Sequence, residues 1–159
     1  RATHLPSPGR ALGPAASEAG LHSLFCLEPA PTMTALTLPE LFTDVDGRAR
    51  FRDAAMALDE GTPLTRLSAL QASGGCQFRR SPAGFASDFH CTTTPQWLVV
   101  LQGRMEIGLQ DGSTRVFGPG ECFYSNDTLP PGATFDAKLH GHRSRLLGDD
   151  ALVTLFVRA

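Results

Sequence analysis

The chain has 159 residues, of which 42% are hydrophobic and 19% are charged, and its formal net charge is −2. These values are typical of a globular protein of one domain, and they give no reason to expect a nucleic acid or an anionic membrane as partner. The longest apolar run, Trp97 to Leu101, is far shorter than the roughly 18 residues of a membrane span.

The four cysteines do not indicate a metal site or a disulfide scaffold. Cys26, Cys76, Cys91 and Cys122 form no C-x-x-C pair and no zinc-ribbon spacing. Residues 1–32 lack the pattern of a secretory signal. We therefore predict free, mostly buried thiols and a cytoplasmic location.

Residues 1–32 differ from the rest of the chain in composition. They are rich in Pro, Ala, Gly and Ser and show no sustained period of 2 or 3.6, which predicts a disordered segment. One hypothesis is a natural start at Met33, with 1–32 as a non-native extension; the alternative is a genuine flexible arm. Residues 33–159 are expected to form a single β-barrel domain.

The first elements of this domain are the least clearly patterned. Pro39, followed by Glu40, Leu41 and Phe42, predicts a short helical turn with proline near its start. Residues 48–58 have apolar residues at helical spacing, whereas the all-β pattern that follows favours a strand. We expect a strand there.

From residue 64 onward the pattern is all-β, with short runs of β-forming residues separated by glycine-containing turns. In residues 104–109, apolar and polar residues alternate, which predicts a strand with one buried face and one solvent-exposed face. Many short, regularly spaced strands indicate a closed barrel or a jelly roll. The expected strands are 64–71, 76–80, 97–101, 104–109, 114–117, 121–124, 142–147 and 151–158.

Within this β pattern lies a set of glycine and polar residues at fixed spacings, which we call a frame. Gly84 is followed after five residues by His90, then after one by Thr92, after three by Gln96 and after six by Gly103. In a regular strand, the even separations of His90, Thr92 and Gln96 place them on one face, which in a barrel is the interior. Cys91 and Trp97 would then face outward.

A second frame follows the first. It runs from Gly112 to Gly118 after five residues, Gly120 after one, Phe123 after two and Asp127 after three. The two frames, in this order, resemble the two motifs of the cupin family, G-x5-H-x-H-x3-4-E-x6-G and G-x5-P-x-G-x2-H-x3-N. The resemblance covers about residues 48–158 and implies an all-β fold, the cupin double-stranded β-helix, a jelly-roll-like barrel.

The resemblance also implies where a cupin metal would be held. Metal-binding cupins supply three His and one Glu, a donor set that suits a divalent first-row metal. The matching positions here are His90, Thr92, Gln96 and Phe123. Only one of these is a good ligand for such a metal, so we expect no resident metal cofactor.

A subset of small cupin-like proteins has a W-H-x-x-P-x-x-Q first motif and a D-T-x-G-x-G-H-x-x-R ending, and this chain looks similar. Phe89-His90 precedes Pro95-Gln96, and Asn126-Asp127-Thr128 is separated from Gly141-His142 by an insertion, residues 129–140. His142, like His90, is thereby expected to reach the interior, and the two form a site if they converge with Gln96. Asp127 is either a local turn-capping residue or an orienting partner or general base for His142. The insertion is either a lid or a passive excursion.

Three functions remain open, and no enzymatic reaction can be named from the sequence. The first is binding of a small organic molecule in the barrel interior. The second is a metal-dependent enzyme, isomerase or dioxygenase-like, with a divalent transition metal on His90, Gln96 and His142. The third is a structural homodimer in which Trp97, Val99 and Leu101 pack against a second copy. The candidate ligand-binding residues are His90, Thr92, Gln96, Phe123, Asp127 and His142.

Overall fold

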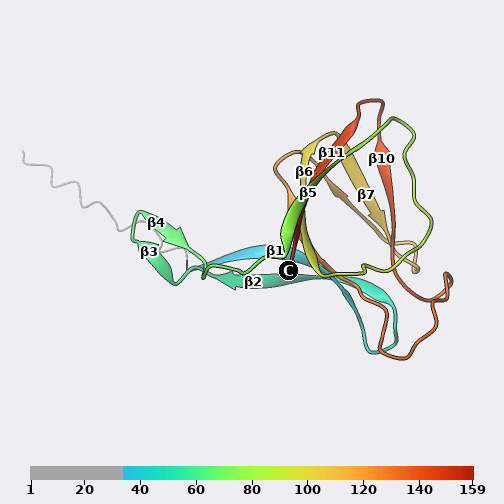
Figure 1. Ribbon diagram of the computed structural model, residues 1–159, viewed down its shortest axis with the longest axis horizontal. Coiled ribbons are helices and arrows are strands. Elements are labelled where there is room, and N and C mark those ends of the chain that lie inside the picture. The colour runs from blue at the N-terminus through green and yellow to red at the C-terminus, as the bar shows by residue number, and fades with distance from the viewer. Residues whose placement is uncertain (1–33) are drawn as a thin grey trace, which may run out of the picture. The chain divides into compact units, whose positions relative to one another are not determined.

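The computed structural model describes residues 34–159, which form eleven β-strands (Figure 1). This part of the chain contains no helix, and so none that is long and apolar enough to cross a membrane. The predictions for residues 1–32 and for Met33 lie outside the described residues. The strands are β1 (Ala35–Thr43), β2 (Ala49–Ala57), β3 (Glu60–Thr62), β4 (Thr65–Leu67), β5 (Gly75–Ser81), β6 (Gln96–Gln102), β7 (Arg104–Gly108), β8 (Thr114–Phe117), β9 (Cys122–Asn126), β10 (Arg143–Leu147) and β11 (Leu152–Arg158).

Two sheets form the barrel, as the all-β pattern predicts. The larger sheet has the order β2-β1-β9-β6-β11-β5, and the smaller has the order β10-β7-β8. Isolated bridges from Ala86 to Arg145 and from His90 to His142 place residues 86–90 alongside β10, which widens the smaller sheet. Strands β3 and β4 form a separate two-stranded hairpin.

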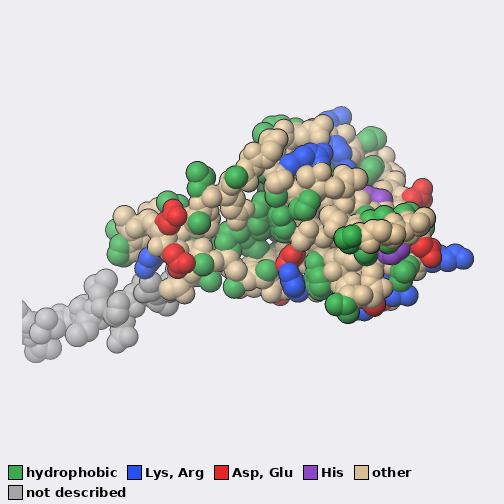
Figure 2. All heavy atoms as spheres, turned by 60° about the horizontal axis from the view of Figure 1, so that its bottom comes forward, with side chains coloured by type: hydrophobic (Ala, Val, Ile, Leu, Met, Phe, Trp, Pro, Cys, Tyr) green, Lys and Arg blue, Asp and Glu red, His purple; other side chains and the backbone are tan. Residues whose placement is uncertain are grey.

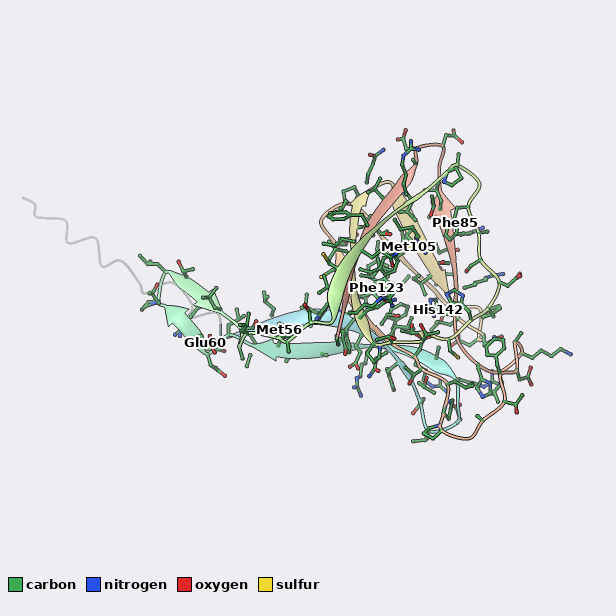
Figure 3. All side chains as sticks on the ribbon, in the orientation of Figure 1. Met56, Glu60, Phe85, Met105, Phe123 and His142 are labelled. Carbon is green, nitrogen blue, oxygen red and sulfur yellow. The ribbon has the colours of Figure 1, made fainter. Side chains whose placement is uncertain are left out.

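The core lies between the two sheets and is apolar. Its centre is an aromatic cluster of Phe51, Phe117 and Phe123, with the ring centroids of Phe117 and Phe123 4.5 Å apart. Figure 3 shows Met105 and Phe123 inside the barrel, whereas Met56 and Glu60 lie out along β2 and β3. The buried apolar core is Leu41, Ala49, Leu98, Val100, Met105, Ile107, Leu109, Phe117, Phe123, Leu146 and Leu152.

The glycines of the two sequence frames lie in turns, as predicted. Gly84, Gly103, Gly112 and Gly120 all have positive φ, between 77° and 86°. Gly103 joins β6 to β7, and a Cβ there would come within 2.9 Å of the Ala151 carbonyl oxygen. A side chain at this turn would therefore be strained by both conformation and space.

Two expectations near the start of the domain are decided by the structure. The helical turn at 39–42 is wrong, because Pro39 lies inside β1, opposite Asp53 of β2. Pairing of β1 with β9 begins only at Glu40, so Pro39 lies where β1 has one partner strand and a missing N–H costs little. The strand expected at 48–58 is confirmed as β2.

The strand predicted at 64–71 is mostly wrong. Only Thr65–Leu67 is extended in a ladder, as β4, and residues 68–74 belong to no strand. Leu64 and Leu70, which lie in the predicted strand, are 98% and 96% exposed. The prediction of mostly buried cysteines is also wrong for the described part: Cys76 is exposed, whereas Cys91 and Cys122 are half-buried and free.

Candidate functional site

A cavity of about 340 Å³ lies between the sheets, beyond one end of the apolar core. Strand register explains its position. On the inner face of the larger sheet, Val100 and Leu98 of β6 are buried, and the next inward residue, Gln96, lines the cavity. The cavity therefore begins where inward side chains change from apolar to polar. The polar lining includes Arg79, His90, Thr92, Gln96, His142 and Ser144, and the apolar lining includes Leu98, Met105, Ile107 and Phe156.

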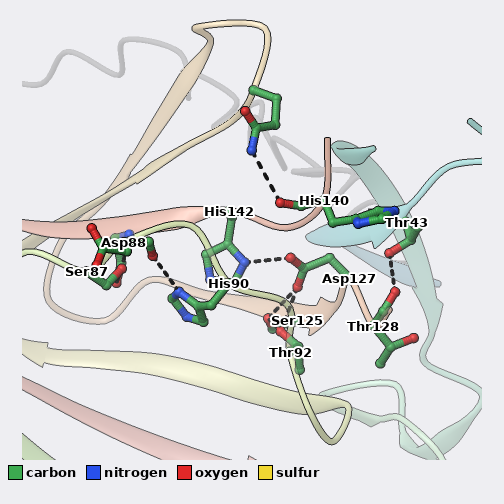
Figure 4. A network of polar contacts seen from close by, with 12 residues as sticks. Thr43, Ser87, Asp88, His90, Thr92, Ser125, Asp127, Thr128, His140 and His142 are labelled. Carbon is green, nitrogen blue, oxygen red and sulfur yellow. Dashed lines mark hydrogen bonds and ion pairs between the residues drawn. The ribbon is translucent and has the colours of Figure 1, made fainter. Parts of the chain in front are cut away.

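His142 and Asp127 form a buried pair at this cavity (Figure 4). The His142 Nδ1 atom lies 2.6 Å from Asp127 Oδ2, and Asp127 is 0% exposed. An ionised carboxylate can only accept, so Nδ1 carries the proton and Nε2 keeps its lone pair when the ring is neutral. This contact is the one that an orienting role for Asp127 requires.

The other carboxylate oxygen of Asp127 is also occupied. The Thr92 hydroxyl donates to Asp127 Oδ1 at 2.6 Å, and Ser125 Oγ lies 2.6 Å from Thr92 Oγ1. The Thr92 amide also donates to the Asp127 carbonyl at 3.2 Å. Thr92, Ser125 and Asp127 are all buried, and each has a partner, as buried polar groups require. The Asp127 carboxylate thus lies behind the cavity wall.

His90 lies directly across from His142. Their backbones exchange both N–H···O bonds, at 2.8 and 2.9 Å, and their ring centroids are 4.5 Å apart. His90 Nδ1 lies 2.9 Å from the Asp88 carbonyl, to which it donates. Within residues 34–159, neither histidine has a hydrogen-bond partner at Nε2. Both rings therefore have a nitrogen available to a molecule in the cavity.

Gly141 makes this approach feasible. Its φ is 75°, and a Cβ built on it would collide with the His90 carbonyl. A residue without a side chain is needed here because the two backbones pass so closely. The glycine before His142 therefore brings the two histidines together.

The cavity also contains two arginines. Arg158 donates to Gln96 Oε1 at 3.2 Å and to Gln77 Oε1 at 3.4 Å. Arg79 lies near two aromatic rings, with its Cζ atom 4.9 Å from the Phe156 centroid and 5.1 Å from that of Phe85. Desolvation lowers the pKa of Arg79. No Asp or Glu of residues 34–159 lines the cavity, so its lining is cationic.

The side chains at the positions of the cupin metal ligands do not form a site for a divalent metal. Thr92 is engaged with Ser125 and Asp127, Gln96 accepts from Arg158, and Phe123 packs in the aromatic cluster. Within residues 34–159, no group of three or more His, Cys, Asp or Glu is placed to hold a metal ion. Two histidine Nε2 atoms are fewer donors than a catalytic zinc or iron site employs.

The structure brings together most of the predicted site. His90, Thr92, Gln96 and His142 line the cavity. Asp127 lies behind His142, and Phe123 lies deeper in the core and does not line it. No residue of 129–140 lines the cavity either; the insertion packs elsewhere, with Gln110 donating to the Ala137 and His140 carbonyls.

Sequence reasoning placed one residue wrongly and missed others. Cys91 contributes to the cavity lining instead of facing outward, because residues 91–95 belong to no strand and do not alternate regularly. The pKa of the Cys91 thiol is raised, mainly by desolvation and further by the negative charge of Asp127. Arg79 and Arg158 were missed. Residues 76–80 carry polar side chains on both faces, so alternation along this strand does not identify its inner face or the direction of Arg79.

Comparisons with known proteins assign no function to the chain. No family model matches the chain, and no curated protein matches it. The solved structures that are similar include protein NMB1881 from Neisseria meningitidis, at 14% identity and a TM-score of 0.35, covering 56% of this chain and 79% of that one. The Drosophila melanogaster CENP-C cumin domain has 14% identity and a TM-score of 0.38, and the match covers 92% of this chain and 85% of that one. The Schizosaccharomyces pombe Cnp3 cupin domain has 11% identity and a TM-score of 0.37, and the match covers 79% of this chain and 85% of that one.

These TM-scores lie below 0.5, so the fold assignment depends on the chain itself. The two glycine frames have their turn conformations, and two antiparallel sheets face each other around one core. The described chain has an all-β, cupin-like fold.

Proposed function

We propose that this protein binds a small organic molecule in the barrel cavity without a resident metal. The observation that carries the proposal is the pair His90 and His142, whose Nε2 atoms have no partner within residues 34–159, beside a cavity of about 340 Å³ lined by both polar and apolar side chains. Ligand sites are concave, largely apolar and equipped with a few fixed polar groups. The small net charge favours a small-molecule partner over a nucleic acid or a membrane.

Metal analysis of untagged protein tests the metal-free part of this proposal. Because Thr92 and Gln96 are already engaged, we expect metal far below one equivalent in the wild type, and no change in His90→Ala. Stoichiometric iron, manganese, zinc or nickel that is lost in His90→Ala would contradict the proposal. It would favour a metal-dependent enzyme instead.

Ligand binding is tested by native mass spectrometry of the purified protein, followed by analysis of any small molecule released on denaturation. We expect a bound species that is lost in the double variant His90→Ala/His142→Ala and kept in Asp149→Asn, a change in the exposed turn before β11. A species retained by the double variant would show that the histidines are not its site.

A second candidate function, a structural homodimer, is favoured by an apolar groove on the outer face. Trp97 and Val99 of β6 line it with Leu38 of β1, Met56 of β2 and Val157 of β11, around a hollow of about 570 Å³. Figure 2 shows hydrophobic side chains gathered in the middle of the visible face. The outer half of β1 pairs with β2 alone and leaves Leu36 exposed. A second copy could cover both surfaces at once, as an isologous interface requires.

Sedimentation velocity tests the dimer, with Val99→Lys as the disrupting change and Val45→Lys as the control. Val45 is fully exposed in the β1–β2 turn and lies outside the groove. We expect a dimer for the wild type and Val45→Lys, and a monomer for Val99→Lys. A wild type that stays monomeric at high concentration would remove this candidate.

A further inference from the structure

Arg79 combines a buried donor with a place in the cavity wall. Five other described arginines lie within 4 Å of a carboxylate: Arg48, Arg50, Arg52, Arg115 and Arg145. Arg79 forms no ion pair with any residue of 34–159, and its Nε is buried with no hydrogen-bond partner; Arg66 has the same two features but does not line the cavity. The Arg79 side chain as a whole is half-buried, and a buried donor atom without an acceptor is costly.

The register of the larger sheet directs Arg79 into the barrel. It lies opposite Thr154 of β11, which in turn lies opposite Val100 of β6. Thr154 and Val100 are fully buried, and residues directly opposite in a ladder share a face. Thr154 Oγ1 is a second buried atom without a partner. Arg79 therefore belongs to the inner face, on the β5 side of the cavity.

Two aromatic rings lie near the guanidinium of Arg79. Its Cζ atom is 4.9 Å from the ring centroid of Phe156 in β11 and 5.1 Å from that of Phe85, within the range of cation–π attraction. A guanidinium is planar and presents pairs of N–H groups side by side. That geometry matches a carboxylate, which accepts two parallel N–H bonds.

The cavity walls distinguish a carboxylate from a phosphate. Leu98, Ile107 and Phe156 require an apolar body next to the charged group. Arg158, the other cation, already donates to Gln96 and Gln77, so Arg79 is the cavity guanidinium without an acceptor. A carboxylate has two oxygens for its N–H groups, whereas a phosphate brings more acceptor atoms than this one guanidinium satisfies.

We propose that the ligand of this cavity is a small organic carboxylate, with its carboxyl group on Arg79 and its apolar body along Phe156 and Leu98. A hydrogen-bond donor on the same molecule would reach the His90 and His142 Nε2 atoms. The inference depends on the proposed function, because it names the chemical class of that ligand. Asp127 does not compete for Arg79, since its oxygens are held by His142 and Thr92.

Binding of paired probes to the full chain tests the inference. Benzoate, salicylate and hexanoate are titrated beside benzamide, salicylamide and hexanamide, with inorganic phosphate as a further probe, and followed by ligand-observed NMR. The variants are Arg79→Gln, Arg79→Lys, Arg80→Gln and His90→Ala. Arg80 is the adjacent, exposed residue of β5 and serves as the matched control. A thermal melt of each variant verifies folding, and Arg79→Lys replaces Arg79→Gln if the latter fails to fold.

The expected result is binding of at least one acid, none of its amide, and a loss of about tenfold or more in Arg79→Gln and Arg79→Lys but not in Arg80→Gln. Equal binding of acid and amide, with loss only in His90→Ala, would overturn the carboxylate and leave the proposed function standing. Phosphate binding as tight as that of the acids would overturn the choice of a carboxylate. Absence of binding by every probe, together with no small molecule released from the native protein, would overturn both.

Discussion

The inner face of the barrel has a packed end and a hollow end, and a few residues separate them. At the packed end, Val100 and Phe123 are almost fully buried and the aromatic rings touch. At the hollow end, the inward residues are Gln96, Arg158 and Ser125, which lie opposite one another on neighbouring strands. The same strands thus stabilise the fold at one end and present polar groups at the other.

This division means that folding and binding depend on different layers of side chains. Apolar side chains fill the packed end to the density of a protein interior, where any missing group leaves a void. Polar side chains at the hollow end are hydrogen-bonded to one another, as with Thr92, Ser125 and Asp127, and a free volume remains between them. Changes at the two ends should therefore have different effects on stability.

The largest expected effect is at the packed end. Phe123→Ala removes a buried ring that contacts Phe51 and Phe117, and we expect a loss of about 3–5 kcal/mol in the free energy of unfolding. His90→Ala, at the hollow end, removes an exposed ring and should cost within about 1 kcal/mol. Urea denaturation of both variants measures the difference. Equal losses would show that the two ends are not separable layers.

A smaller effect is expected where the two histidine-bearing segments cross. Gly141→Ala adds a Cβ that collides with the His90 carbonyl at a positive φ, whereas Gly148→Ala meets the same backbone strain with no atom within 4 Å. We expect about 1 kcal/mol for Gly148→Ala and about 2–3 kcal/mol for Gly141→Ala. Urea denaturation gives the two values, and the histidine ring signals in NMR should shift only in Gly141→Ala. Similar losses of unfolding free energy in both variants would mean that the close approach of Gly141 to the His90 backbone adds no cost beyond the backbone strain.

Much of the fold follows from local patterns in the sequence. Alternation in residues 104–109 predicted β7, and the glycine frames predicted the turns at Gly103 and Gly112, because both signals depend on neighbouring residues. Pro39 misled the prediction because its tolerance in β1 depends on where β9 begins to pair, which is a long-range fact. Leu64 and Leu70 misled it because exposure is also decided by distant neighbours.

The site was predictable only in part, for the same reason. Spacing placed His90, Thr92 and Gln96 at the cavity, and the motif that ends the chain added His142. Arg79 could not be assigned, because its inward direction follows from pairing with Thr154, some 75 residues later in the chain by their numbers. A half-buried arginine with a partnerless Nε, such as Arg79, is recognised only once the structure shows which hydrogen-bond partners surround it.

The smallest expected effect is that of the Asp127 charge on the thiol pKa of Cys91, compared with that of Cys122. Burial raises the pKa of both thiols, and the charge of Asp127 raises that of Cys91 further, but not that of Cys122. A raised pKa in the folded state favours the protonated thiol, so this contribution to stability is present at neutral pH and is lost as pH rises through the folded pKa. Both thiols should therefore react slowly with iodoacetamide at neutral pH and faster at alkaline pH.

Asp127→Asn should separate the two thiols. Removing the negative charge lowers the pKa of Cys91, so its alkylation should accelerate at neutral pH, while Cys122, whose pKa is raised by burial alone, keeps its rate. Mass spectrometry of peptides after timed alkylation gives both rates in one sample. If both thiols accelerate together, the variant has loosened the barrel as a whole; if neither does, the Asp127 charge does not reach the hollow end. Acceleration of Cys91 alone is the result expected if the Asp127 charge acts on the thiol that lines the cavity and not on Cys122.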